Sequence, residues 1–275
     1  MKTIAIVSSV GGAGRTTLTA ALAGLLAARE HVALAAECDP RNVLALHFGL
    51  RESAREGLVT HLSGGPGDAW SRAALQSDDG VLVLPWGSLA NGNASDDSRD
   101  DDASALLDAR PGWLRELLAR VDLPAHTIAL VDAGTWPSAH ARQAIDAADL
   151  VLGILTPCAS ACATLPRLIA ALVRAQKRSV FVANAVVPAR QLHMDVVALL
   201  RARLGAAMLP YLVHADTGVP AALAAGENFC LSAPSSQAAH DLHGIASWLS
   251  HWSTGASLDA PDELLAQHVA RGSTP

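Results

Sequence analysis

The sequence is poor in charge, since only 17% of its 275 residues are Asp, Glu, Lys or Arg while 51% are hydrophobic. Disordered chains show the opposite balance, because they cannot bury enough apolar surface to offset the entropy lost on folding. The net charge of −6 also gives no overall attraction to nucleic acid or to an anionic membrane. We therefore expect a folded protein with a large core and no nucleic-acid partner.

Cysteine is scarce and shows no C-x-x-C spacing, and nothing at the start of the chain resembles a secretory signal, because the first apolar run ends after about five residues. Long apolar runs are also missing. The richest region, 147–175, is interrupted by prolines and charged residues well short of the roughly 20 residues that a membrane-spanning helix needs. These absences predict a soluble cytoplasmic protein with reduced thiols and no direct membrane insertion.

The most informative stretch is residues 8–17, SSVGGAGRTT, which follows the apolar run at residues 3–7. The pattern predicts a strand, a glycine loop and a helix in succession. Backbone N–H groups around Gly11, Gly12 and Gly14 can converge on an anion, and the helix N-terminus points its positive dipole end at the same place. The Thr16 hydroxyl occupies the position at which P-loop proteins hold Mg²⁺. The stretch therefore predicts a phosphate cradle.

The match to a P-loop is incomplete. The pattern G-x-x-x-x-G-K-[ST] requires glycine at position 9 and lysine at position 15, whereas this chain has Ser9 and Arg15. Glycine-rich turns between a strand and a helix also occur without any ligand. The interpretation therefore depends on what the rest of the sequence brings to the same place.

Carboxylates follow two further predicted strands. Residues 32–36 are followed by Glu37 and Asp39, and the strand at 126–131 is followed by Asp132. Open parallel sheets bind ligands at the carboxyl ends of their strands, so these three acids are expected at one edge together with the glycine loop. Asp132 is the natural partner for Mg²⁺, through the groups that bind the ion directly.

In the rest of the chain predicted strands alternate with predicted helices. This alternation predicts an α/β fold with a mostly parallel sheet covered on both faces. Further strands are expected at 80–85, 150–155, 179–184 and 208–213. Helices are expected at 17–28, 53–77 (one or two), 111–120, 158–176, 190–203, 219–225 and 237–252. We expect one nucleotide-binding domain over residues 1–253 and a flexible tail over 254–275.

Residues 87–104 hold a cluster of aspartates, at positions 96, 97, 100, 101 and 102. We interpret this segment, and its part 91–104 in particular, as a mobile solvated loop. A cation site rich in carboxylates is the alternative, but the run lacks the ligand spacing and turn glycine of a calcium loop.

These motifs together resemble the MinD/ParA group of deviant Walker A ATPases, P-loop proteins of the SIMIBI class, over nearly the whole chain. Within that group the sequence is most similar to the BcsQ (YhjQ) family of cellulose biosynthesis proteins. The loop K-G-G-x-G-K-T-T of the group is matched by its glycines and threonines, while Val10 and Arg15 replace its two lysines. The switch D-x-D-P resembles residues 37–40, where Glu37 departs by one methylene.

The resemblance implies that the chain binds ATP and Mg²⁺ and forms a homodimer that sandwiches the nucleotide. Asp39 would orient the attacking water, Thr16 and Asp132 would serve the metal, Asn184 would contact adenine, and His214 would lie beside it in a segment that resembles I-P-x-D…A. The nucleotide-binding residues that the resemblance implies are Gly11, Gly12, Ala13, Gly14, Arg15, Thr16, Thr17, Asn184 and His214.

The two lost lysines predict weak hydrolysis. An arginine fork aims its donors differently from a lysine ammonium, and the apolar side chain of Val10 cannot reach a partner's phosphates with a charge. Loss of a cationic contact in phosphoryl transfer costs on the order of 10³ or more in rate. We therefore expect a slow ATPase or a nucleotide-bound scaffold.

The function that the resemblance implies is an ATP-dependent dimeric switch or assembly factor for bacterial cellulose secretion, recruited to the inner membrane by components of the cellulose synthase complex. Two alternatives stay open. One is a positioning ATPase of the MinD type, which usually ends in a basic amphipathic helix that the acidic tail does not resemble. The other is an ATP-dependent ligase of the dethiobiotin synthetase type, which would need an intact P-loop lysine.

Three further features have ordinary explanations beside functional ones. His240 and His243 share a helical face, but surface histidines are more common than two-histidine metal sites. Cys158 and Cys162 are spaced like small residues packed within a helix. Residues 132–134, DAG, resemble the second switch of the MinD/ParA group. Trp136 lies two residues after them and fits either a partner contact or the core.

Overall fold

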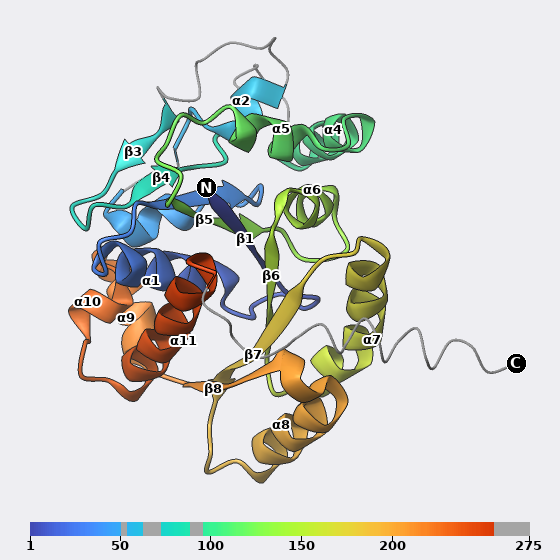
Figure 1. The fold of residues 1–275 in the computed structure, drawn as a ribbon, viewed down its shortest axis with the longest axis vertical. Coiled ribbons are helices and arrows are strands. Elements are labelled where there is room, and N and C mark those ends of the chain that lie inside the picture. Colours follow the sequence, from blue (N-terminus) through green and yellow to red (C-terminus); the bar gives the residue numbers. More distant parts are fainter. Residues whose placement is uncertain (51–53, 63–72, 89–95, 256–275) are drawn as a thin grey trace, which may run out of the picture.

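In the computed structural model, which describes residues 1–50, 54–62, 73–88 and 96–255, eight strands form one sheet (Figure 1). Their order is β3-β4-β2-β5-β1-β6-β7-β8, and all neighbours are parallel except β3 and β4. The predicted α/β class with a mostly parallel sheet is confirmed. The strands are β1 (Lys2–Val7), β2 (Ala33–Cys38), β3 (Leu75–Gln76), β4 (Leu82–Leu84), β5 (Ile128–Ala133), β6 (Leu150–Leu155), β7 (Ser179–Val186) and β8 (Met208–His214).

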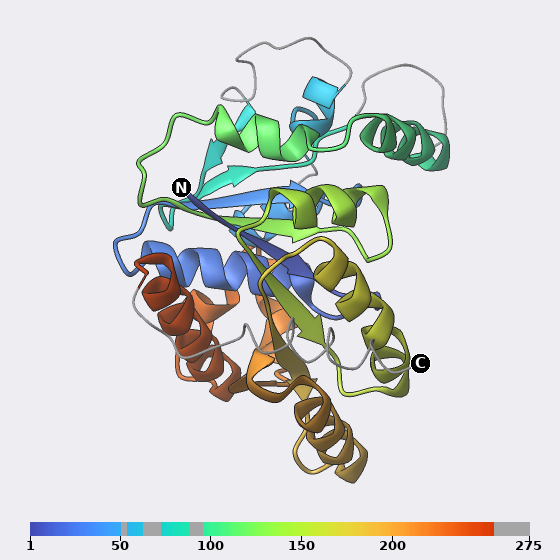
Figure 2. The ribbon, with the colours of Figure 1, turned by 45° about the vertical axis from the view of Figure 1, so that its right-hand side comes forward.

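Helices cover both faces of this sheet, and Figure 2 shows the two helical layers on either side of it. One face carries α1 (Arg15–Ala27), η1 (Leu44–Phe48), α9 (Gly218–Ala225), α10 (Phe229–Ser232) and α11 (Gln237–Ser253). The other face carries α2 (Leu58–Leu62), α4 (Asp96–Ala109), α5 (Trp113–Ala119), α6 (Ala139–Ala147), α7 (Ala159–Arg174) and α8 (Gln191–Leu204), with the short η2 (Gly205–Ala207) after it.

The alternation of side chains along β1 separates two cores. Ile4 and Ile6 face α1 and α11, whereas Ala5 and Val7 face α6 and α7. Helix α1 consists largely of alanine and leucine, and every residue from 18 to 26 in it is buried. A helix without a polar face is stable only when it is covered on most sides, and α11 and the sheet provide this cover for α1.

The prediction of a loop through residues 87–104 is wrong from residue 96 onward, because α4 begins at Asp96. Residues 89–95 lie outside the described part of the chain. Negative charge in a first helical turn is favourable beside the exposed N–H groups of a helix. Farther along, Ala103 and Leu107 are spaced by one turn and both buried against the core, which gives this helix its anchor.

The prediction of helix through residues 53–77 is correct only in part. Helix α2 has five residues, and Leu75 and Gln76 form the short strand β3, antiparallel to β4. Residues 51–53 and 63–72 lie outside the described part. The elements η1, α6, η2 and α10 are additions to the prediction, and the remaining predicted elements are present with ends displaced by a few residues. Helix α11 ends at Ser253, and the tail beyond residue 255 is not described.

None of the helices in the described ranges is long and apolar enough to cross a membrane.

The close packing of the sheet can be tested at Gly153 in β6. A Cβ added there would lie 2.3 Å from Cδ1 of the fully buried Phe181. We expect Gly153→Ala to lower the free energy of unfolding by about 1–3 kcal/mol, because a packed core has no room for the methyl group. Urea denaturation followed by circular dichroism measures the change. Gly11→Ala, where an added Cβ meets nothing within 4 Å, is the control. Equal stability of the two variants would contradict this account.

Candidate functional site

Three segments meet at the carboxyl ends of β1, β2 and β5. They are the glycine loop before α1, the turn that follows β2, and residues 134–138 after β5. The backbone N–H of Trp136 donates to the carbonyl of Ser8 at 2.9 Å, and the N–H of Gly134 donates to the carbonyl of Cys38 at 2.9 Å. The three segments are therefore hydrogen-bonded to one another through their backbones.

The glycine loop takes a shape that depends on two of its glycines. Gly12 and Gly14 have φ angles of 69° and 87°, in the left-handed region that favours glycine, and Gly14 is the N-cap of α1. A Cβ on Gly14 would also lie 2.4 Å from Nδ2 of Asn184. This Asn184 amide donates to the carbonyl of Ala13 at 2.7 Å, so β7 supports the loop from the side.

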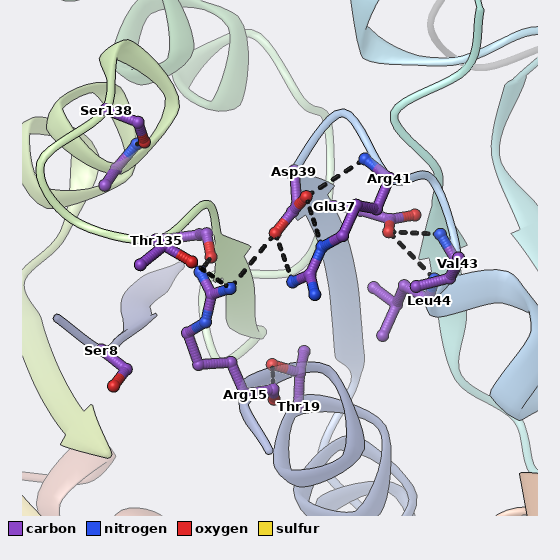
Figure 3. A network of polar contacts seen from close by, with 12 residues as sticks. Ser8, Arg15, Thr19, Glu37, Asp39, Arg41, Val43, Leu44, Thr135 and Ser138 are labelled. Carbon is purple, nitrogen blue, oxygen red and sulfur yellow. Dashed lines mark hydrogen bonds and ion pairs between the residues drawn. The ribbon is translucent and has the colours of Figure 1, made fainter. Parts of the chain in front are cut away.

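Arg15 is the first residue of α1, and its guanidinium is buried between the ends of β2 and β5 (Figure 3). It donates to the carbonyl oxygen of Ala133, to Oγ1 of Thr135 at 2.9 Å and to Oδ2 of Asp39 at 3.4 Å. Burial lowers the pKa of Arg15, and the negative charges of Asp132 and Asp39 oppose that shift. The side chain at the position of the P-loop lysine thus joins the segments that follow β2 and β5.

Asp39 lies between two arginines, as Figure 3 shows. Its Oδ2 accepts from Nη2 of Arg41 at 2.7 Å and from Nη2 of Arg15, while its Oδ1 accepts from Nε of Arg41 at 3.0 Å. Burial alone would raise the pKa of Asp39, but the hydrogen bonds and charge of Arg41, with the charge of Arg15, hold it below its ordinary value. Asp39 is therefore a charged carboxylate with both oxygens engaged.

Glu37 uses its extra methylene to reach a different partner. Its Oε1 accepts from the backbone N–H groups of Val43 at 2.6 Å and Leu44 at 3.0 Å, at the start of η1. Its second oxygen has no hydrogen-bond partner among the described residues. Burial and the neighbouring Asp132 raise the pKa of Glu37 well above its ordinary value. The carboxyl group caps η1 from a buried position.

Asp132 lies beside Glu37 in register, on the face of the sheet that α1 covers. It is fully buried, and neither carboxylate oxygen accepts a hydrogen bond within the described residues. Burial raises its pKa to about 7; the Thr16 hydroxyl and Arg15 oppose this shift, although Thr16 does not reach hydrogen-bond geometry. A buried carboxylate without a donor next to a threonine hydroxyl fits a divalent cation, because oxygen ligands suit Mg²⁺.

Asn184 and His214 lie on the other side of the loop. His214 ends β8, and its Nδ1 is 2.6 Å from Oδ2 of Asp241 in α11, an oxygen that also accepts from the His214 backbone N–H at 3.0 Å. Asn184 lies within β7, which continues to Val186. The structure therefore brings Asp39, Asp132, Arg15 and Thr16 together at one edge, whereas His214 is paired with α11.

The other candidates stay apart from this edge. His243 contacts Arg29 through Nδ1 at 3.2 Å, and no group of three or more metal-ligating side chains suitable for an ion occurs in the part of the chain that the structure describes. Cys158 and Cys162 are half-buried, both as free thiols. Trp136 is partly buried against the core that includes α6, which favours the packing interpretation.

Sequence reasoning missed the contribution of Arg41 and Thr135, and the pairing of His214 with Asp241. Arg41 follows the switch by one residue, so a cation beside a buried acid could have been suspected from its position. Thr135 directly follows the second switch, but only the structure shows that its hydroxyl accepts from Arg15. The distance of 27 residues between His214 and Asp241 leaves no local signal.

A sequence model of the family described as "cellulose biosynthesis protein BcsQ" matches residues 1–249. The chain belongs to the BcsQ family. A search of curated proteins gave no match. Among solved structures, the chain resembles MinD of Pyrococcus horikoshii OT3 in complex with Mg-ADP, with a TM-score of 0.72 and 19% identity over 93% of this chain and 98% of that one.

The fold is shared equally with an enzyme. Cobyrinic acid a,c-diamide synthase of Mycobacterium smegmatis, with an ATP analogue and magnesium bound, has a TM-score of 0.72 and 18% identity over 93% of this chain and 97% of that chain. MinD in the MinC:MinD complex of Aquifex aeolicus has a TM-score of 0.70 and 18% identity over 95% and 98%. At these identities the likeness establishes the MinD/ParA-type fold of this BcsQ-family chain, and the residues at the edge must decide its chemistry.

The raised pKa of Asp132 predicts a pH-dependent loss of stability. A carboxyl whose pKa rises on folding contributes stability below its unfolded pKa, near 4, and loses that contribution as the pH rises through the folded value of about 7. Without metal, Asp132→Asn should therefore gain about 2–3 kcal/mol relative to the parent between pH 5 and pH 8. Urea denaturation in EDTA across this range measures the gain.

The control is Asp108→Asn, at an exposed ion pair with Arg142. A pH-independent difference between Asp132→Asn and the parent would show that Asp132 titrates normally.

Proposed function

We propose that this BcsQ-family protein binds Mg-ATP at the carboxyl edge of its sheet and acts as a dimeric switch or assembly factor for bacterial cellulose biosynthesis and secretion. The observation that carries the proposal is the meeting of a glycine loop with the buried Asp132, whose oxygens accept no hydrogen bond among the described residues, next to Thr16. A loop shaped for an anion and an acid suited to a cation, side by side, match a metal-bound phosphate.

Different residues at this edge would bind the phosphate and the metal ion. Nothing lies within 4 Å of a Cβ added at Gly11 or Gly12, so a phosphate can approach the loop backbone there, and α1 presents its N-terminus at the same place. Thr16 and Asp132 would hold Mg²⁺ between them. The ion, when bound, neutralises negative charge on the phosphate oxygens.

The contacts of Arg15 and Asp39 support a switch rather than an efficient hydrolase. Asp39 is the residue proposed to orient the attacking water, but its two oxygens accept from arginines. Arg15 is committed to Ala133 and Thr135. Hydrolysis would require these contacts to rearrange, so slow or absent turnover is the proposed behaviour.

The same contacts favour this function over that of a small-molecule ligase. The likeness to cobyrinic acid a,c-diamide synthase is as strong as the likeness to MinD, so the overall fold does not separate the two. An ATP-dependent ligase must transfer a phosphoryl group at every turnover. Arg15 is buried and bonded to the segments after β2 and β5, so it is poorly placed to stabilise the charge of that group as it moves. The Aquifex MinD structure contains MinC, and by analogy we propose partner proteins of the cellulose synthase complex for this chain, reached at the inner membrane from the cytoplasm.

Mg-ATP binding can be tested at Gly14. We expect Gly14→Ala to weaken binding of Mg-ATP by roughly 10-fold or more, because a Cβ there strains a left-handed residue and strikes Asn184. Isothermal titration with a non-hydrolysable ATP analogue and Mg²⁺ measures the affinity. Gly80→Ala, which imposes similar strain at φ 78° with nothing within 4 Å of the new Cβ, is the matched control. Undiminished binding by Gly14→Ala would place the nucleotide elsewhere.

The dimer is tested by light scattering with and without the analogue and Mg²⁺. The parent should double its mass only when both are present, and Gly14→Ala should stay at the mass of one chain. A parent that stays monomeric at saturating nucleotide would refute the dimeric switch while leaving nucleotide binding intact.

A further inference from the structure

Arg41 differs from Arg15 in how it is held. The Arg15 side chain is 2% exposed and contacts residues after both β2 and β5, whereas the Arg41 side chain is 53% exposed. Within the described residues, every hydrogen bond that the Arg41 side chain makes goes to Asp39. Both arginines reach the same oxygen, Oδ2 of Asp39. The more exposed of the two is therefore the one free to exchange its partner.

The turn that carries Arg41 is fixed at its backbone. The N–H of Asn42 donates to the carbonyl of Asp39 at 3.1 Å. The Asn42 side chain donates to the carbonyl of Ala54 at 2.6 Å and accepts from the N–H of Gly87 at 3.1 Å. The backbone is anchored on both sides, so the side chain of Arg41 can change partner while the turn stays in place.

The edge also needs a further positive charge if it is to hold a triphosphate. Val10 is apolar and packs against the core beside α1. Arg15 is occupied by Ala133 and Thr135. A guanidinium pairs with a phosphate through two parallel hydrogen bonds as readily as with a carboxylate, and a terminal phosphate carries more charge than Asp39.

We propose that Arg41 recognises the terminal phosphate of the bound nucleotide, and that its departure from Asp39 releases the carboxylate that would orient water. The inference rests on the proposed nucleotide function and adds a residue that distinguishes a triphosphate from a diphosphate. In the absence of the terminal phosphate Arg41 stays on Asp39 and keeps both of its oxygens engaged. One side chain thereby couples the detection of ATP to the release of Asp39.

The test compares affinities for a non-hydrolysable ATP analogue and for ADP, both with Mg²⁺, by isothermal titration. Arg41→Gln should reduce the preference for the triphosphate by about 10-fold or more, mainly through weaker binding of the ATP analogue. Arg41→Lys, which keeps the charge but cannot form the two parallel hydrogen bonds, should lose less of the preference than Arg41→Gln. Arg142→Gln, at an exposed ion pair of similar exposure, is the control and should behave as the parent.

A second variant separates recognition from a structural role. Asp39→Asn removes the charge that holds Arg41, so it should strengthen binding of the ATP analogue several-fold while affinity for ADP stays unchanged. The gain should vanish in the double variant Asp39→Asn with Arg41→Gln, because the Arg41 guanidinium is gone and Arg15 stays bonded to Ala133 and Thr135. A structural ion pair would instead weaken both nucleotides together.

The outcomes distinguish the two proposals. A parent that binds neither nucleotide overturns the proposed function itself. A parent that binds both, with Arg41→Gln showing an unchanged preference or Arg41→Lys losing as much as Arg41→Gln, overturns only the inference about Arg41.

Discussion

The parallel pairing of β2, β5 and β1 is the constraint on which the site depends. Parallel strands end at one edge, and the register places Glu37 beside Asp132 and Asp132 beside Ile6 on the face that α1 covers. Helix α1, which follows β1, starts at the same edge, so Arg15 and Thr16 in its first turn lie next to the acids. A slip of one residue in β5 would turn Asp132 to the opposite face, among the side chains of α6.

Crowding of acids at this edge is relieved in three different ways. Asp39 stays charged because two guanidinium groups accompany it. Glu37 has a pKa well above its ordinary value, and one of its oxygens accepts from two backbone N–H groups. In the described structure Asp132 accepts a hydrogen bond neither from a guanidinium group nor from a backbone N–H group. Its burial therefore appears as a raised pKa. Such an uncompensated group is typical of a functional site rather than of a stabilising one.

Sequence reasoning could predict what depends on local pattern. The alternation of apolar runs with helical periods gave the class of fold, and the acids at strand ends were placed at one edge because parallel topology leaves little choice. It failed at residues 96–102, where the aspartate-rich composition suggested a loop but the buried Ala103 and Leu107 farther along hold a helix. Tertiary contact overrode local composition there.

Side-chain direction lay beyond the sequence altogether. The pattern placed Arg15 at the glycine loop. Only the fold shows that its guanidinium donates to Ala133 and Thr135, after β5, instead of pointing into the loop. The same holds for Glu37, whose added methylene is a small change in sequence yet gives it a new partner in η1. The roles of Asn184 and His214 toward a nucleotide remain proposals, since their present partners are Ala13 and Asp241.

A carboxyl group that titrates near neutral pH turns the arrival of a metal ion into an exchange reaction. When a cation occupies Asp132, any proton on that carboxyl must leave for the solvent, so the two compete for one position. The heat measured for metal uptake near pH 7 would then include the ionisation heat of whatever buffer receives the proton. In a cell the same exchange would make metal occupancy at Asp132 depend on the surrounding pH, although the Asp132 side chain is buried and has no contact with solvent.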